Sequence, residues 1–222
     1  MNKKLLKKLK IFSLLKKIKR FKLNNEKILL ENSLGRFLAF DLRSEINLPP
    51  FKNSAVDGFA ILKSDILKKK TDLIYKQRVA AGDKLPKNIK VGEVARIFTG
   101  AQMPLNSSTV IMQENVLVKK GYITIKKMPS YGENCRFAGE DIKKGRKILF
   151  KGNKINSTNI NLIAAIGKKN IFVKKKINIG FFTSGNELRE PTEKLKDSEI
   201  NNSNYYSLKA LLDKSYIKSK YL

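Results

Sequence analysis

The chain has 222 residues, 41% of them hydrophobic, which is enough for one or two domains with a sizeable core. It carries a net charge of +28 and no histidine, and its one cysteine is Cys135. These counts exclude histidine-dependent catalysis, histidine-ligated metals, internal disulfides and multi-cysteine zinc sites, and leave carboxylates, lysines, hydroxyls and a hard cation such as Mg²⁺ for chemistry.

The N-terminal segment predicts an amphipathic helix over residues 3–19, because apolar residues recur at three- to four-residue spacing. Lysines fill the opposite face, and no segment resembles a signal peptide or reaches the length of a membrane span. We expect this helix to dock on the rest of the fold, with binding to a membrane surface as the alternative. Its apolar positions are Leu5, Leu9, Phe12, Leu15 and Ile18.

A second helix is predicted over residues 26–41, followed by a strand-rich region. Short β-branched and aromatic runs separated by glycine-containing turns are typical of a compact β-domain rather than a βαβ unit. The candidate strands are residues 56–62, 74–80, 93–98, 109–113 and 122–127.

The remaining third of the chain predicts mixed structure. We expect a strand over 147–150, a helix over 158–166 capped by Ser157, and a short strand over 171–173. A buried strand over 176–183 then leads through a glycine loop to a helix over 205–214, which Asn202–Asn204 caps. No second parallel strand is predicted after it.

The segment Leu48–Ile61 reads L-P-P-F-K-N-S-A-V-D-G-F-A-I. Two prolines fix the backbone, and Asp57-Gly58 can form a tight turn. The segment thus holds one carboxylate on a rigid loop beside apolar side chains. From these residues alone, a plain hairpin turn and a functional site are both open.

This segment resembles the P-P-F-D-N-S-A-M-D-G-Y-A signature of the molybdopterin molybdenumtransferase family, the MoeA and gephyrin E-domain type of molybdenum insertase. Three further motifs follow in the family's order, and the resemblance covers residues 24–212, about the N-terminal half of a typical member. They are Arg96–Ala101 with Val110–Glu114, Gly139–Ile142, and Thr183–Leu188.

The resemblance implies an α+β, multidomain chain. A β-domain at 48–130 would be inserted in a helix/β domain formed by 19–47 and 131–174, after an N-terminal helix at 1–18. Residues 175–222 would be the first strand–helix unit of an incomplete, truncated α/β molybdopterin-binding domain. We expect that end to be loosely held, and we expect no molybdenum insertion by this chain alone.

The resemblance also implies an activity, insertion of molybdate into adenylylated molybdopterin with release of AMP, dependent on Mg²⁺. It implies a cytoplasmic homodimer whose cleft combines the β-domain of one subunit with the α/β domain of the other. The implied catalytic residues are Asp57, Thr99, Asp141 and Glu187, with Asp57 and Glu187 as metal ligands and Ser184 and Gly185 binding the pterin substrate.

For each of these residues a structural role is the alternative. Asp57 and Thr99 can cap turns, Asp141 can pair with Arg136, and Glu187 can be a plain loop carboxylate. Lys52, Asn186 and Asn202 replace acidic residues of the family pattern.

Two other functions remain open. One is a non-catalytic, dimerising or binding module of the same family. The other is a basic protein that binds nucleic acid or membrane surfaces. The latter is disfavoured because 39 of the 47 basic residues are lysines spread along the chain, whereas phosphate and guanine readout favours arginine. We therefore expect a small anionic substrate and no nucleic-acid partner.

Overall fold

The computed structural model describes Ser13 and residues 22–222. The helix predicted for residues 3–19 lies outside the described residues. The described chain is a mixed α and β structure in which strands predominate. No helix within it has the length and apolar character needed to cross a membrane.

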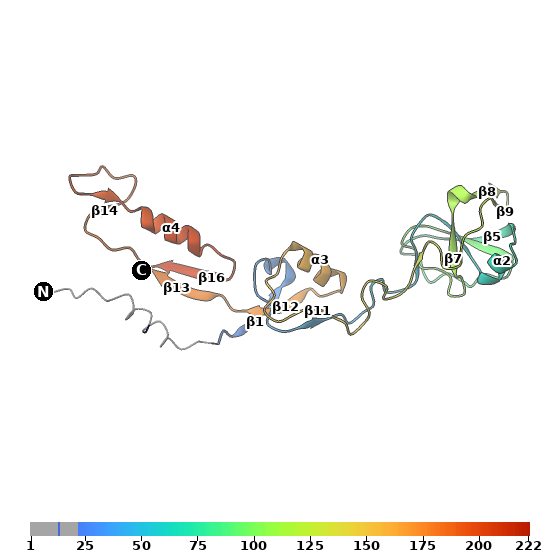
Figure 1. The fold of residues 1–222 in the computed structure, drawn as a ribbon, viewed down its shortest axis with the longest axis horizontal. Helices are drawn as coiled ribbons and strands as arrows, with labels where there is room; N and C mark the ends of the chain where they lie inside the picture. The colour runs from blue at the N-terminus through green and yellow to red at the C-terminus, as the bar shows by residue number, and fades with distance from the viewer. Residues whose placement is uncertain (1–12, 14–21) are drawn as a thin grey trace. The chain divides into compact units, whose positions relative to one another are not determined.

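The chain divides into two compact units (Figure 1). The boundaries of these units do not coincide with the predicted domain boundaries at residues 47, 130 and 174. The four-part domain scheme stays a prediction. Unit 1 contains the described residues up to Asp41, Phe150–Ala164 and Lys168–Leu222, and unit 2 contains Leu42–Leu149 and Ala165–Gly167.

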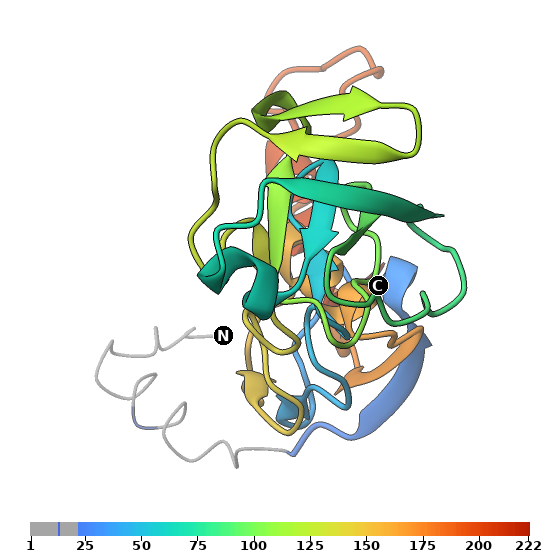
Figure 2. The ribbon, with the colours of Figure 1, turned by 90° about the vertical axis from the view of Figure 1, so that its right-hand side faces the viewer.

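A six-stranded sheet forms the body of unit 2. Its strands are β4 (Gly58–Ile61), β5 (Asp72–Val79), β6 (Glu93–Ile97), β7 (Thr109–Met112), β8 (Val116–Lys119) and β9 (Tyr122–Ile125). The strand order is β7-β4-β6-β5-β9-β8. Only β5 and β6 run parallel, and the other neighbours are antiparallel. Figure 2 shows the β8–β9 hairpin at one edge of the sheet.

Five predicted strands appear in this sheet with their ends shifted by at most two residues. The strand β8 and a short helix, α2 (Lys63–Leu67), were not predicted. The five residues of α2 are too few to reveal a helical period. Asp65 inside α2 is fully buried, and both of its carboxylate oxygens accept from the backbone N–H of Gly92.

Alternation along the strands places apolar side chains on both faces of the sheet. All four residues of β4 are buried, with Ala60 on one face and Phe59 and Ile61 on the other. The first core cluster contains Ala60, Leu62, Val79, Ile89, Ala95, Ile97, Ala101, Met103 and Val110. The second contains Phe59, Ile61, Leu73, Val94, Ile111, Val116, Ile123 and Ile125.

Short pairings complete unit 2. Two antiparallel pairs flank the loop before β4, and a 3-10 helix follows β7. The pairs are β2 (Leu42–Arg43) with β11 (Lys147–Leu149) and β3 (Asn53–Ser54) with β10 (Cys135–Arg136), and the 3-10 helix is η2 (Gln113–Asn115).

The helix predicted over residues 26–41 is wrong. These residues form β1 (Asn25–Leu29), a 3-10 turn η1 (Leu30–Asn32) and irregular chain. Strand β1 pairs antiparallel with β12 (Asn170–Lys174). Gly35 adopts a left-handed φ of 73°, which ends any helical path, and a Cβ there would lie 2.2 Å from Ser215 Oγ. The apolar spacing arises from a strand followed by a turn.

Helix α3 (Ser157–Ala165) agrees with the predicted helix to one residue, but its cap is Asn156 rather than Ser157. The Asn156 side chain accepts from the N–H of Asn159, and the Asn159 side chain accepts from the N–H of Asn156. This is a reciprocal capping arrangement built from two amides. Gly167, with φ 78°, follows the helix as predicted.

The C-terminal segment of unit 1 contains a second parallel strand, which corrects the prediction that none follows. The strands β13 (Ile177–Phe181) and β16 (Ile217–Tyr221) pair in parallel, and the helix α4 (Ser203–Leu212) lies between them in the sequence. Lysines at two of five positions hid β16 from pattern analysis. Rings of Phe181, Tyr205 and Tyr221 pack where α4 meets the strands, although α4 buries no residue.

Candidate functional site

Asp57 and Thr99 meet at one end of the unit 2 sheet. Asp57 comes directly before β4 and Thr99 lies two residues after β6, and these strands pair with Gly58 opposite Ile97. The N–H and the hydroxyl of Thr99 both donate to Asp57 Oδ1 at 2.8 Å. The structure therefore brings together two of the predicted site residues.

The loop that carries Asp57 is fixed by backbone and side-chain bonds. Ser54 N–H donates to Ala101 O, and Gly100 N–H donates to Ser54 O. Gly100 has φ 79°, which glycine adopts without strain. Lys52, which departs from the family's acidic residue, uses its ammonium to bind the carbonyl of Ser107. This departure therefore has a structural role in the loop.

Hydrogen bonds and charge keep Asp57 ionised. The backbone N–H of Thr99 is the largest cause that lowers the pKa of Asp57, followed by the Thr99 hydroxyl and then by the positive charge of Arg96. A carboxylate with a lowered pKa is a weak base and a poor proton donor at neutral pH. It is better suited to hold a cation or to orient its neighbours.

An open pocket of about 470 Å³ is lined by residues of β4, β5, β6, β8 and η2. Its polar members are Arg96, Gln113 and Glu114, and its apolar members are Phe59, Tyr75 and Val118. The Arg96 guanidinium lies 4.9 Å from the ring centre of Phe59 and 5.0 Å from that of Phe98. Sequence reasoning gave these residues no role, although Arg96, Gln113 and Glu114 belong to the second family motif.

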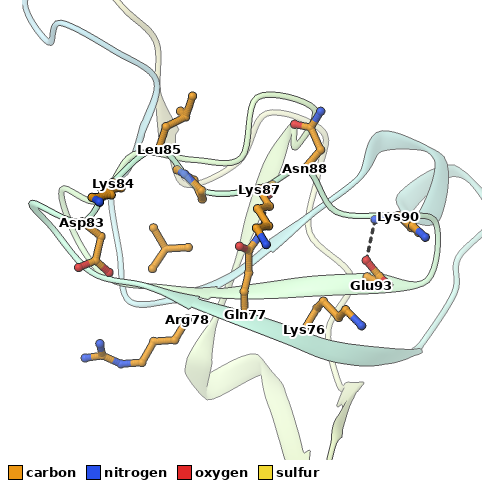
Figure 3. A pocket seen from close by; sticks show the side chains of 12 residues that line it. Lys76, Gln77, Arg78, Asp83, Lys84, Leu85, Lys87, Asn88, Lys90 and Glu93 are labelled. Atoms are coloured by element: carbon orange, nitrogen blue, oxygen red, sulfur yellow. Dashed lines mark hydrogen bonds between the residues drawn. The ribbon is translucent and has the colours of Figure 1, made fainter.

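A second pocket in unit 2, of about 570 Å³, lies between β5 and the loop that leads to β6 (Figure 3). Figure 3 shows Lys87 of the loop opposite Gln77 of β5, and the Gln77 amide donates to the Lys87 carbonyl at 2.6 Å. The two carboxylates that line this pocket, those of Asp83 and Glu93, each accept a hydrogen bond from a nearby backbone N–H. No predicted site residue lines this pocket.

Asp141 has a structural partner. Its carboxylate is 2.5 Å from Arg136 Nη2, and its backbone N–H donates to Leu48 O. The bond to Asp141 is also the main cause that raises the pKa of Arg136. The ion pair that was considered as the structural alternative for Asp141 is therefore present. No described contact joins Asp141 to Asp57 or Thr99.

Ser184, Gly185 and Glu187 lie in unit 1, on the exposed loop after β13. The Glu187 carboxylate turns back over Gly185, where an added Cβ would lie 2.4 Å from it. Beside this loop the side chain of Asn202 accepts from Tyr205 N–H and donates to Thr183 Oγ1 at 2.9 Å. The amide at this departure from the family pattern thus caps α4 and ties it to the end of β13.

The described residues contain no group of three or more Asp, Glu, Cys or His able to hold a metal. Mg²⁺, however, often binds to one or two carboxylates and completes its shell with water and substrate phosphates. Among the described residues Asp57 Oδ2 accepts no hydrogen bond, whereas Oδ1 accepts two. One oxygen of Asp57 is thus available to a cation that arrives with a phosphate.

Comparison with known proteins gives consistent results. The family model for the MoeA N-terminal region (domain I and II) matches residues 4–167. A molybdopterin molybdenumtransferase of Haemophilus influenzae is 33% identical over 195 residues, 87% of this chain and 48% of the relative. One of Staphylococcus epidermidis is 34% identical over 84% of this chain and 46% of the relative.

Solved structures agree with these relatives. The crystal structure of a molybdopterin biosynthesis MoeA protein from Pyrococcus horikoshii OT3 has a TM-score of 0.82 and 32% identity, and it covers 89% of this chain and 54% of that one. The chain spans about half the length of the curated relatives it matches. With its model matching most of the sequence, the chain belongs to the family of the MoeA N-terminal region, domains I and II.

Proposed function

We propose that the chain acts in molybdenum cofactor biosynthesis, in the cytoplasm, as a molybdenumtransferase that inserts molybdate into adenylylated molybdopterin with release of AMP. The observation that carries this proposal is the Asp57–Thr99 pair, which stands on the family's first two motifs. Relatives that carry the name molybdopterin molybdenumtransferase support it.

Both reactants of this reaction are anions, so the site must neutralise charge before they can meet. Asp57 and Arg96 suit complementary parts of that task. Arg96 offers a guanidinium to an oxyanion, and Asp57 Oδ2 offers a ligand to a cation. A bound Mg²⁺ would supply Lewis-acid stabilisation of the phosphate charge.

Thr99 would orient an oxyanion, and its geometry sets a condition for that role. Its hydroxyl and its N–H both donate to Asp57 Oδ1 in the described state. A hydroxyl has one proton to donate, so Thr99 can bind a substrate oxygen only when its hydroxyl turns away from Asp57. Substrate binding would therefore release one of the two bonds that lower the pKa of Asp57.

We also propose that the working form is a homodimer. In that arrangement, Glu187 of one subunit would serve with Asp57 of the other as a metal ligand, and Ser184 and Gly185 would bind the substrate. Asp141 would act through Arg136 as a positioning residue rather than at the reacting atoms. The roles of Glu187, Ser184 and Gly185 rest on the family resemblance, which also implies a catalytic role for Asp141, whereas the positioning role of Asp141 rests on its ion pair with Arg136.

A chimaera tests the proposal. Residues 22–222 replace the corresponding segment of the Haemophilus influenzae relative, and cofactor formation is measured in a strain without its own insertase. Asp57→Ala should abolish cofactor formation. The matched control is Asp72→Ala, because Asp72 also accepts from a threonine hydroxyl, that of Thr124 at 2.6 Å. Full activity of the Asp57→Ala chimaera would overturn the assigned role.

A further inference from the structure

Three polar residues of the second family motif have no part in the proposed reaction beyond the charge of Arg96. These are Arg96, Gln113 and Glu114, and all three line the 470 Å³ pocket. Residues of a functional motif that gather around one concavity are candidates for ligand contacts.

The pocket opens beside Asp57. Gln113 N–H donates to the backbone carbonyl of Asp57 at 3.1 Å, and the charge of Arg96 acts on the Asp57 carboxylate. Phe59 is two residues from Asp57 and lies opposite Arg96 in the sheet. A ligand in this pocket would thus have one end close to the Asp57–Thr99 pair.

The polar wall of the pocket is held in one arrangement. Arg96 donates to the side-chain oxygen of Gln113, and the Gln113 amide donates to Glu114 Oε1 at 3.1 Å. The guanidinium also lies 4.9 Å from the ring centre of Phe59 and 5.0 Å from that of Phe98. Such a connected wall reduces the entropy lost when a ligand binds.

The polar wall leaves one hydrogen-bond acceptor without a partner among the described residues. Glu114 is exposed, and its Oε2 has no hydrogen-bond partner among the described residues, so this oxygen can accept from N–H groups of a ligand. Guanidinium planes and tyrosine rings stack on flat heteroaromatic rings. Tyr75 is 38% exposed and Val118 is 65% exposed, so the apolar side of the pocket is accessible to a ligand from solvent.

We infer that this pocket binds the pteridine ring of the substrate, with Glu114 accepting from the 2-amino and N3–H groups. The inference rests on the proposed function, because a pterin is the substrate that this function supplies. A carboxylate selects a ring edge with two adjacent N–H donors, as it selects amino donors on nucleic-acid bases. Arg96 and Tyr75 would stack on the ring, and the ring's substituent would point toward Asp57.

The test measures binding of two small rings to the intact chain by calorimetry. Pterin carries the 2-amino group, whereas lumazine carries an oxo group in its place. We expect pterin to bind at least about tenfold more tightly, because a site built for a donor leaves its acceptor unpaired with lumazine. Glu114→Gln should reduce this preference to less than about threefold, by weakening the binding of pterin.

Two control variants separate the possible outcomes. Glu31→Gln removes the same charge at an exposed site in unit 1 and should keep the full preference. Asp72→Ala should also keep it, because Asp72 does not line the pocket and its carboxylate accepts from the Thr124 hydroxyl. Amide shifts in NMR spectra should change at Tyr75, Gln113 and Val118 when pterin is added.

Equal binding of pterin and lumazine, no binding of either, or an unchanged preference in Glu114→Gln would overturn the inference. Shifts confined to residues 183–188 would also overturn it, because the ring would then lie in unit 1. A chimaera that is inactive while the pterin preference is intact would instead overturn the proposed function. An active chimaera without the preference would overturn the ring site alone.

Discussion

Two carboxylates stand on family motifs of similar quality, and the structure holds them very differently. Asp57 is fixed by two bonds from Thr99, next to the strand β4, whose four residues are all buried between the two core clusters of the sheet. Glu187 lies on an exposed loop after β13, whose side chains alternate between half-buried and exposed, and the neighbouring helix α4 buries none of its residues. A motif therefore identifies a residue, whereas the surrounding packing decides whether its side chain is prepared for chemistry.

Adding one methyl group in each region tests whether the surroundings of Asp57 are packed more rigidly than those of Glu187. Gly58→Ala would place a Cβ 2.0 Å from the Ile111 carbonyl oxygen, a backbone atom that cannot move without separating β4 from β7. We expect its free energy of unfolding to fall by about 3 kcal/mol or more. Chemical denaturation followed by tyrosine fluorescence measures this change.

Gly185→Ala is the matched variant for unit 1. The three atoms nearest to its Cβ would all belong to the Glu187 carboxylate, the free end of a flexible side chain, so we expect a loss below about 1 kcal/mol. Equal losses of unfolding free energy in the two variants would contradict the comparison. They would show that Asp57 and Glu187 are held with similar firmness.

Limited proteolysis sharpens the comparison along the chain. Residues 186–202 contain only two-residue strands, β14 (Leu188–Arg189) and β15 (Ile200–Asn201), and most of their side chains are exposed. We expect a protease of broad specificity to cut there first, while Leu42–Leu149 stays intact. Uniform protection through Leu212 would contradict the expected loose C-terminal segment.

The Asn202 side chain tests how much of the unit 1 loop is fixed. Asn202→Ala removes both the cap on α4 and the bond to Thr183, which should cost about 1–2 kcal/mol of local stability. Hydrogen exchange of the α4 amides measures the loss. Asn202→Asp should keep most of the protection, because a carboxylate can accept from Tyr205 N–H and from the Thr183 hydroxyl. Equal losses in both variants would rule out the capping role.

The sequence predicted most strands of unit 2, because short apolar runs separated by glycine turns mark them. It failed where local pattern and tertiary structure disagree. Residues 26–41 have helical apolar spacing, but Gly35 and the pairing of β1 with β12 impose a strand and a turn. Strand β16 is visible only through its parallel partner β13.

The candidate site was predictable to the same degree. Motif position alone identified Asp57 and Thr99, but the bonds that lower the pKa of Asp57 depend on the register of β4 with β6. The pocket lined by Arg96, Gln113 and Glu114 was missed because its members come from different strands and turns. Their shared motif was the available signal.

The smallest predicted effect concerns the pKa of Asp57. Thr99→Val removes the hydroxyl but keeps the backbone N–H, which is the larger cause of the lowering. The pKa should therefore rise in the variant and still remain below the ordinary value of an aspartate. Carbon-13 NMR of the Asp57 carboxyl group measures it, and Thr124→Val, which removes the hydroxyl from the Asp72 pair, should leave it unchanged.

The sign of the accompanying stability change follows from linkage. The pKa of Asp57 is lower in the folded chain than in the unfolded chain, so the ionised carboxylate stabilises the fold above the unfolded-chain pKa. That contribution is lost as the pH falls through the folded-state pKa. Thr99→Val should thus lose stability at neutral pH and converge with the unchanged chain in acid. A difference that grew toward low pH would mean that the Thr99 hydroxyl does not favour the ionised form of Asp57.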